Sequence, residues 1–165
     1  MDKTNIVVFR SKQAHVDLDG MYYLAGQPIT QTHCYKYLGM YFHEHMTWKE
    51  HEKHVLKKVR ASSHFISSIS VKSSLITAAT ISQLSKSILY PQISYGFAFW
   101  KPTTATIWNK LTSLCLAPVR KVLSLPKDAH RLGICMLTGL LPLRMYREQT
   151  LAYTALRFMK LNEYT

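Results

Sequence analysis

Residues 47–66 read TWKEHEKHVLKKVRASSHFI, and this stretch decides the fold. An α-helix turns by about 100° per residue, so positions three or four apart share a face. The side chains at this spacing that suit a packed stripe are Trp48, Val55, Val59, Ser62 and Ile66. Basic side chains occupy an arc well away from that stripe: Lys49, Lys53, Lys57, Arg60 and His64. The stretch therefore predicts a long helix with one packed face and one basic face.

The residues before this helix predict strands. Short apolar runs between turn residues are typical of strands, and they occupy residues 6–9, 16–18, 21–24 and 37–42. Asp19-Gly20 is a two-residue hairpin signal, because glycine accepts the positive φ that such a turn requires. A second turn is indicated by the Gly-Gln-Pro sequence that begins at Gly26.

A second helix is expected over residues 74–90, and its first turn offers Ser73 or Ser74 as the capping residue. The inward side chains at helical spacing would be Ile76, Leu84 and Ile88. Proline has no N–H to donate and crowds the preceding turn, so Pro91 should kink the chain there.

Three further helices complete the expected fold. One begins near Thr104, and Pro118 should bend or break it. Asp128 is expected to cap a short helix, and Pro142 is expected in the first turn of the last one. The whole pattern predicts an α+β fold, with a short antiparallel strand or hairpin region in residues 1–46 and a mainly α-helical bundle in residues 47–165.

The charge of the chain points to a polyanionic partner. Twenty-one Lys and Arg against nine Asp and Glu give a formal net charge of +12 in 165 residues. Such an excess creates a positive field that attracts phosphate backbones. The basic helix face can follow a backbone without reading bases, so Lys49, Lys53, Lys57, Arg60 and His64 are the candidate nucleic-acid-binding residues. The alternative is a solvated helix face with no ligand.

Other chemistries have weaker support. Cys34, Cys115 and Cys135 form no C-x-x-C pair, so we expect reduced core thiols. Six of the eight histidines lie between His33 and His64, where zinc binding is one reading and surface histidines are the other. The sequence has no G-x-S-x-G elbow and no phosphate-binding glycine loop. It also has no apolar run of the roughly 20 residues that span a membrane and no apolar leader after the first residues, so we expect a nuclear or cytoplasmic protein.

Several motifs in order resemble the end of the palm, the thumb and the post-thumb region of reverse transcriptases from non-LTR (LINE-like) retrotransposons. The best of them are Tyr-Leu-Gly before an apolar strand and Pro-x-x-x-Tyr-Gly-x-x-x-Trp. In chain order the matching segments are residues 3–4, 37–39, 46–48, 91–100, 120–126 and 139–143. The resemblance covers nearly the whole chain.

The resemblance implies roles for particular residues. Lys3 matches a palm lysine near the incoming nucleotide. Tyr37, Leu38 and Gly39 match the primer-grip hairpin, which positions the primer end. The helix over residues 47–66 would be the first thumb helix, lying along a primer-template duplex of RNA and DNA. Pro118 departs from the usually uninterrupted helix of the family.

The resemblance also implies what this chain lacks. In the family the catalytic aspartates lie before the Lys-Thr segment with which this chain opens, so we expect the chain to be a fragment, inactive alone as an RNA-directed DNA polymerase. Mg²⁺, held by paired carboxylates, is expected only in the intact polymerase, whose palm and fingers would be partners of this part. The rival interpretations are a stand-alone, non-catalytic nucleic-acid-binding protein derived from such a transposable element, and a basic helical scaffold protein.

Overall fold

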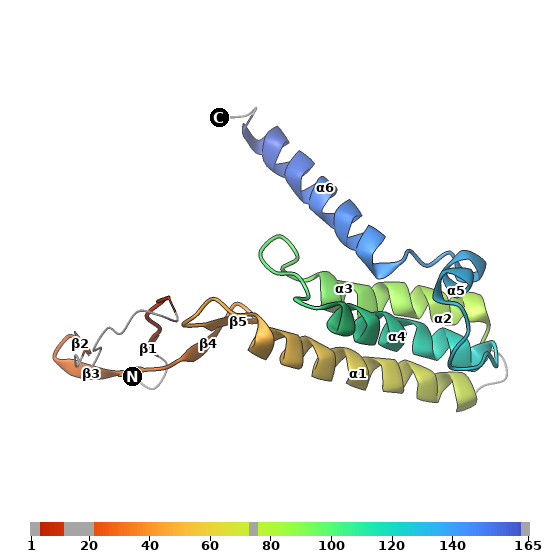
Figure 1. Cartoon of the computed structure of the whole chain (residues 1–165), viewed down its shortest axis with the longest axis horizontal. Helices are drawn as coiled ribbons and strands as arrows, with labels where there is room; N and C mark the ends of the chain where they lie inside the picture. Colours follow the sequence, from red (N-terminus) through yellow and green to blue (C-terminus); the bar gives the residue numbers. More distant parts are fainter. Residues whose placement is uncertain (1–3, 12–21, 73–75, 163–165) are drawn as a thin grey trace. The chain divides into compact units, whose positions relative to one another are not determined.

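The computed structural model describes residues 4–11, 22–72 and 76–162 and confirms the predicted α+β class. Strands occupy the N-terminal part of the chain, and helices follow (Figure 1). The chain divides into two compact units, Met1–Lys53 and His54–Thr165, so the division falls inside the first helix. The expected strand over residues 16–18 and the expected hairpin at Asp19-Gly20 lie outside the described residues.

The first unit opens with three paired strands. Strand β1 (Asn5–Ile6) lies parallel to β3 (Gln27–Gln31), and β2 (Tyr22–Leu24) lies antiparallel to β3 on its other side. Strand β3 was missed from the sequence, because Pro28 indicated only a turn. β1 pairs with the end of β3 beyond Pro28, so the missing N–H of this proline is not needed there.

A tight hairpin follows, and it corrects the expected single strand over residues 37–42. Strand β4 (Cys34–Tyr37) pairs with β5 (Met40–His43), and Leu38 and Gly39 form the two-residue turn between them. Both turn residues have positive φ, 45° at Leu38 and 82° at Gly39. This is the combination that a type I′ turn requires. The single strand expected from the residue pattern is wrong because leucine rarely takes positive φ and so gave no turn signal. The resemblance, by contrast, had implied a hairpin at Tyr37, Leu38 and Gly39.

Helix α1 (Lys49–Lys72) has the predicted division of faces. Val55, Val59 and Ile66 are buried, at 4%, 0% and 0% exposed. The helix begins at Lys49, two residues later than expected, and it ends at Lys72, beyond the expected end at Ile66. In the first unit, the Trp48 ring contacts those of Phe42 and His51 at 5.9 and 6.1 Å between centroids, and His51 is buried rather than at the surface.

The second helical run is interrupted by a wide turn. It consists of α2 (Ala78–Leu84), a π-helical turn η1 (Ser85–Leu89) and α3 (Tyr90–Ser94). Thr77 caps it, with its Oγ1 accepting from the N–H of Thr80 at 3.2 Å, so the helix begins later than expected. The expected caps, Ser73 and Ser74, lie outside the described residues. The π turn precedes Pro91, whose ring would crowd the carbonyl four residues earlier in a regular helix.

The wide turn also changes which side chains face inward. Ile81, Ser85 and Leu89 are fully buried, whereas the predicted Leu84 and Ile88 are only half-buried. Ile76 lies before the N-cap Thr77, so a 100° spacing counted from it already selects the wrong side chain at Leu84. Beyond Leu84 the π turn holds an extra residue and shifts the helical phase again, which affects Ile88.

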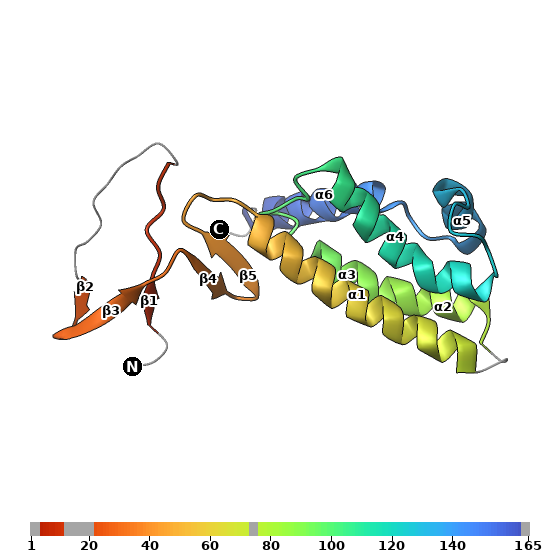
Figure 2. The ribbon, with the colours of Figure 1, turned by 60° about the horizontal axis from the view of Figure 1, so that its bottom comes forward.

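Helix α4 (Ala105–Val122) begins after Thr104, as predicted, and Thr104 accepts a hydrogen bond from the N–H of Ile107 at 3.3 Å. It is not broken at Pro118. Proline has no N–H for the carbonyl of Leu114, but Ser63 of α1 donates its hydroxyl to that carbonyl at 2.7 Å. The replacement bond comes from a neighbouring helix that packs alongside α4 (Figure 2).

Two helices complete the second unit. Helix α5 (Arg131–Thr138) is capped by His130 rather than by the expected Asp128, and Gly139 closes it with φ 62°. Helix α6 (Leu143–Asn162) begins directly after Pro142, which thus precedes its first turn. Helices α1 to α5 enclose a core whose largest buried side chains are Ile66, Ile81, Leu89, Ile93, Phe97, Trp100, Leu111, Leu116 and Ile134. Among the described residues, no helix has the combination of length and apolar character that crossing a membrane requires.

Candidate nucleic-acid interface

The basic face of α1 in the second unit consists of Lys57, Arg60 and His64. All three side chains are exposed, and their spacing of three and four residues keeps them on one side of the helix. Val59, between them in the sequence, is fully buried on the other side. Core packing therefore fixes which way the three basic side chains point.

Lys49 and Lys53 lie at the start of α1, in the first unit, and are also exposed. The Nζ of Lys53 forms an ion pair with the Oε1 of Glu50 at 2.6 Å. Glu50 lies in the first turn of α1, where the helix dipole also favours a carboxylate. The charge of Lys53 is therefore partly neutralised by this carboxylate, whereas the structure shows no ion pair for Lys57 among the described residues.

Two residues from other helices extend the basic face of α1. Arg60 lines an open groove of about 420 Å³ together with Lys110 of α4 and Arg131 of α5. The remaining lining residues are Thr106, Asn109, Ser113 and Leu114, and among the described residues that line the groove none carries a carboxylate. Sequence reasoning missed Lys110 and Arg131 because helical periodicity reports only neighbours on one helix.

The predicted primer-grip residues lie at the β4–β5 turn of the first unit. Tyr37 and Leu38 are 60% and 72% exposed, and Gly39 completes the turn. Behind the turn, the Nζ of Lys36 lies 5.7 Å from the centre of the Tyr41 ring, which is cation–π range. The hairpin thus presents a tyrosine and a leucine at its tip. Lys3 lies outside the described residues.

Two of the histidines, His33 and His45, lie beside a buried carboxylate. Buried Glu44 contacts His33 Nδ1 at 3.1 Å, Arg10 at 3.1 Å and His45 Nε2 at 3.4 Å. The hydrogen bond from His33 and the charges of the three partners hold the pKa of Glu44 below its ordinary value, against the effect of burial. Within the described ranges, no three His, Cys, Asp or Glu side chains form a group that could hold a metal ion.

No family model matches the chain, and neither do the curated proteins or the solved structures with which it was compared. The resemblance to reverse transcriptases therefore rests on the sequence motifs, and the physical argument for a ligand rests on the basic groove. What the groove can do chemically is to bind anions: three cationic side chains from three helices face one open surface.

Proposed function

We propose that this chain binds nucleic-acid duplexes through their phosphate backbones, as the thumb-like part of an RNA-directed DNA polymerase of the non-LTR retrotransposon type. The observation that carries the proposal is the basic groove formed by α1, α4 and α5. Lysine and arginine contacts to phosphates supply most of the affinity of sequence-independent binding.

The cations of this surface are available to a ligand. Within the described part of the chain, no carboxylate oxygen lies within 4.0 Å of the charged nitrogens of Lys57, Arg60 or Lys110. A solvated helix face usually carries Glu at positions that pair with its Lys. Unpaired cations on neighbouring helices instead favour an external polyanion.

The polymerase part of the proposal is supported by the order of the sequence motifs and by the exposed hairpin at Tyr37, Leu38 and Gly39. In such an enzyme this hairpin would position the primer, and the helical unit would hold the duplex. The proposal assigns duplex binding to this chain and no step of nucleotide addition. Mg²⁺ would act in the intact polymerase.

The test measures how binding depends on salt. Fluorescence anisotropy with a labelled RNA–DNA hybrid of about 20 base pairs, from about 50 to about 300 mM KCl, gives the slope of log affinity against log salt. Each phosphate contact contributes roughly −0.9 to that slope, so replacing Lys57, Arg60 and Lys110 together by Ala should flatten it by about 2.7.

A matched control removes the same charges elsewhere. Replacing Lys86, Arg157 and Lys160 by Ala also deletes two lysines and one arginine from exposed positions of the second unit, but none of them lines the groove. The control should keep most of the wild-type slope. Equal flattening by both triple variants would mean that only net charge matters, and wild-type affinity that is absent or independent of salt would favour a scaffold role.

A further inference from the structure

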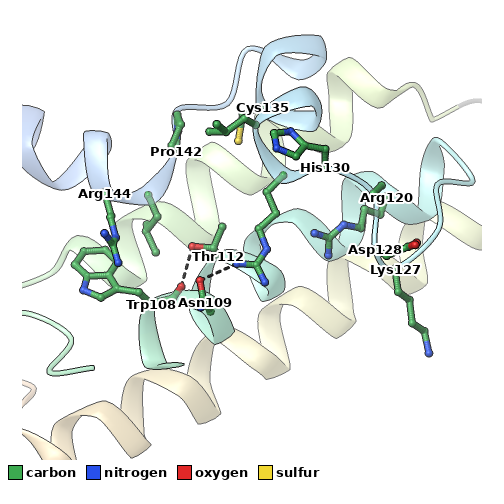
Figure 3. Close-up of a pocket in the computed structure, with 14 residues that line it drawn as sticks. Trp108, Asn109, Thr112, Arg120, Lys127, Asp128, His130, Cys135, Pro142 and Arg144 are labelled. Atoms are coloured by element: carbon green, nitrogen blue, oxygen red, sulfur yellow. Dashed lines mark hydrogen bonds between the residues drawn. The ribbon is translucent and has the colours of Figure 1, made fainter. Parts of the chain in front are cut away.

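A second basic pocket lies near the groove, and the sequence analysis gave no sign of it. It has a volume of about 520 Å³ and is formed by α4, the α4–α5 loop, α5 and the start of α6 (Figure 3). This volume falls in the range of roughly 300–1,000 Å³ that is common for small-molecule sites. Its basic lining residues are Arg120, Lys127, His130, Arg131 and Arg144.

Arg120 lines one end of this pocket (Figure 3). It is half-buried, and its Nε, which is shielded from solvent, has no hydrogen-bond partner among the described residues. Burial and the charge of Arg131 lower the pKa of the Arg120 guanidinium. Two guanidinium groups close together without a carboxylate repel each other, and an unsatisfied buried donor costs free energy. A bound anion would offset the repulsion between the two guanidinium groups.

The acidic groups around the pocket do not supply that anion. Asp128 is the one carboxylate among the described residues that line it, and Asp128 is exposed. No ion pair joins Asp128 to Arg120 or Arg131 within 4.0 Å in the described part of the chain. Arg131 is held by an amide instead, with its Nη1 donating to the Oδ1 of Asn109 at 2.8 Å. The arginine is thereby oriented while its charge stays unneutralised.

The other end of the pocket suits a flat, partly apolar group. Figure 3 shows Trp108 and Arg144 together at the end away from Arg120. The guanidinium carbon of Arg144 lies 5.7 Å from the centre of the Trp108 ring. Apolar wall is added by Leu132, Pro142 and Leu143. Aromatic rings and guanidinium planes are the surfaces on which nucleobases stack.

We propose that this pocket binds a nucleoside phosphate, with the phosphate group between Arg120 and Arg131 and the base beside Trp108 and Arg144. The phosphate group is present both in a free mononucleotide and at the 5′-phosphorylated end of a single strand. The site does not depend on the duplex-binding proposal, because Lys57, Arg60 and Lys110 do not line it. Arg131 lines both surfaces and is therefore left unchanged in the tests.

Binding to the full chain is measured by isothermal titration calorimetry with AMP, adenosine and inorganic phosphate. AMP should bind at least tenfold more tightly than adenosine, because only AMP carries the phosphate. Arg120→Gln should weaken the binding of AMP at least tenfold and leave the binding of adenosine unchanged. Arg144→Gln should weaken the binding of both ligands. Lys86→Gln, outside the pocket, should change neither. Equal binding of AMP and adenosine, or no effect of Arg120→Gln on AMP, would overturn the proposal.

Two further measurements complete the test. A single-stranded oligonucleotide with a 5′-phosphate that binds more than tenfold more tightly than AMP would identify a strand end as the ligand, and equal affinities would identify a free nucleotide. If Arg120→Gln does not fold, amide NMR spectra of the wild-type chain with AMP decide the matter. Shifts at Asp128 and Leu132, which line the pocket and not the groove, support the pocket, and shifts confined to other positions refute it. Lys57→Ala with Lys110→Ala should leave AMP binding intact even where duplex binding is lost.

Discussion

The hydrogen bond from Ser63 to the carbonyl of Leu114 replaces the one that Pro118 cannot make. In Ser63→Ala this carbonyl, which lies between two packed helices, loses its donor. An unsatisfied buried acceptor costs about 1–3 kcal/mol. Because Ser63 is 2% exposed and the bond is only partly buried, we expect a loss of about 1.5 kcal/mol in the free energy of unfolding.

The same loss should shrink when position 118 regains an N–H. In Pro118→Ala the new backbone N–H can bond to Leu114 within the helix, so removal of the Ser63 hydroxyl should then cost about 0.5 kcal/mol or less. The two changes should thus be coupled by about 1 kcal/mol, well above the 0.3–0.5 kcal/mol scatter of independent sites. Urea unfolding of the four chains of this double-mutant cycle, followed by helical ellipticity, measures the coupling.

The control for this cycle lies on the same helix. Ser68 also donates its hydroxyl to a carbonyl, that of Phe65 at 2.8 Å, but it is exposed and the carbonyl is in its own helix. Ser68→Ala should change the free energy of unfolding by less than about 0.5 kcal/mol in both backgrounds. If Ser63→Ala costs the same with and without Pro118, the compensation described for α4 is not the reason for this bond.

Three more predictions concern single groups. Because the pKa of Glu44 is lowered in the folded chain, Glu44 stabilises the surrounding fold at pH values above the ordinary glutamate pKa of about 4.3. This contribution is lost as pH falls through the lower folded pKa. The amide NMR signal of Glu44 should report that acid transition, and Glu44→Gln should abolish the transition. Burial raises the pKa of the Cys115 thiol to about 12, so iodoacetamide at pH 8 should modify half-exposed Cys34 first and Cys115 only on unfolding, as mass spectrometry of peptides will show. Gly139→Ala should lower the free energy of unfolding, measured in urea, by about 1 kcal/mol because φ is 62° at this position. Gly133→Ala, inside α5, should instead stabilise the chain. A Gly139→Ala chain as stable as the wild type would contradict the strain argument.

The parts of the fold that were predicted from the sequence are those with a single, uninterrupted period. Val55 and Val59 fall on the buried side of α1 because a regular helix repeats its faces every 3.6 residues. The phase of the next run was wrong for two reasons: the helix begins only after Thr77, and no residue pattern announces the π turn that follows Leu84. The residue pattern alone gave no signal for the Leu38-Gly39 turn, which only the resemblance implied, because the sheet imposes on Leu38 a backbone conformation that leucine alone would avoid.

The candidate sites divide in the same way. The basic face of α1 was visible in the sequence because its members lie three and four residues apart on one helix. Lys110 and Arg131, and the whole pocket around Arg120, depend on how α4 and α5 pack, which local spacing does not contain. The net charge indicated that further basic residues lie on the surface, but it did not indicate which of them come together.

The wide turn at Ser85–Leu89 has a consequence for the comparison of sequences. A π turn accommodates one residue more than the α-helical turn it replaces. A relative of this chain without that residue would show a one-position gap in the middle of a helix, where alignments normally penalise gaps most heavily. The gap would mark no loop and no loss of a motif. Placing it between Ser85 and Leu89 would keep the buried positions on both sides of it in register, Ile81 before the gap and Ile93 after it.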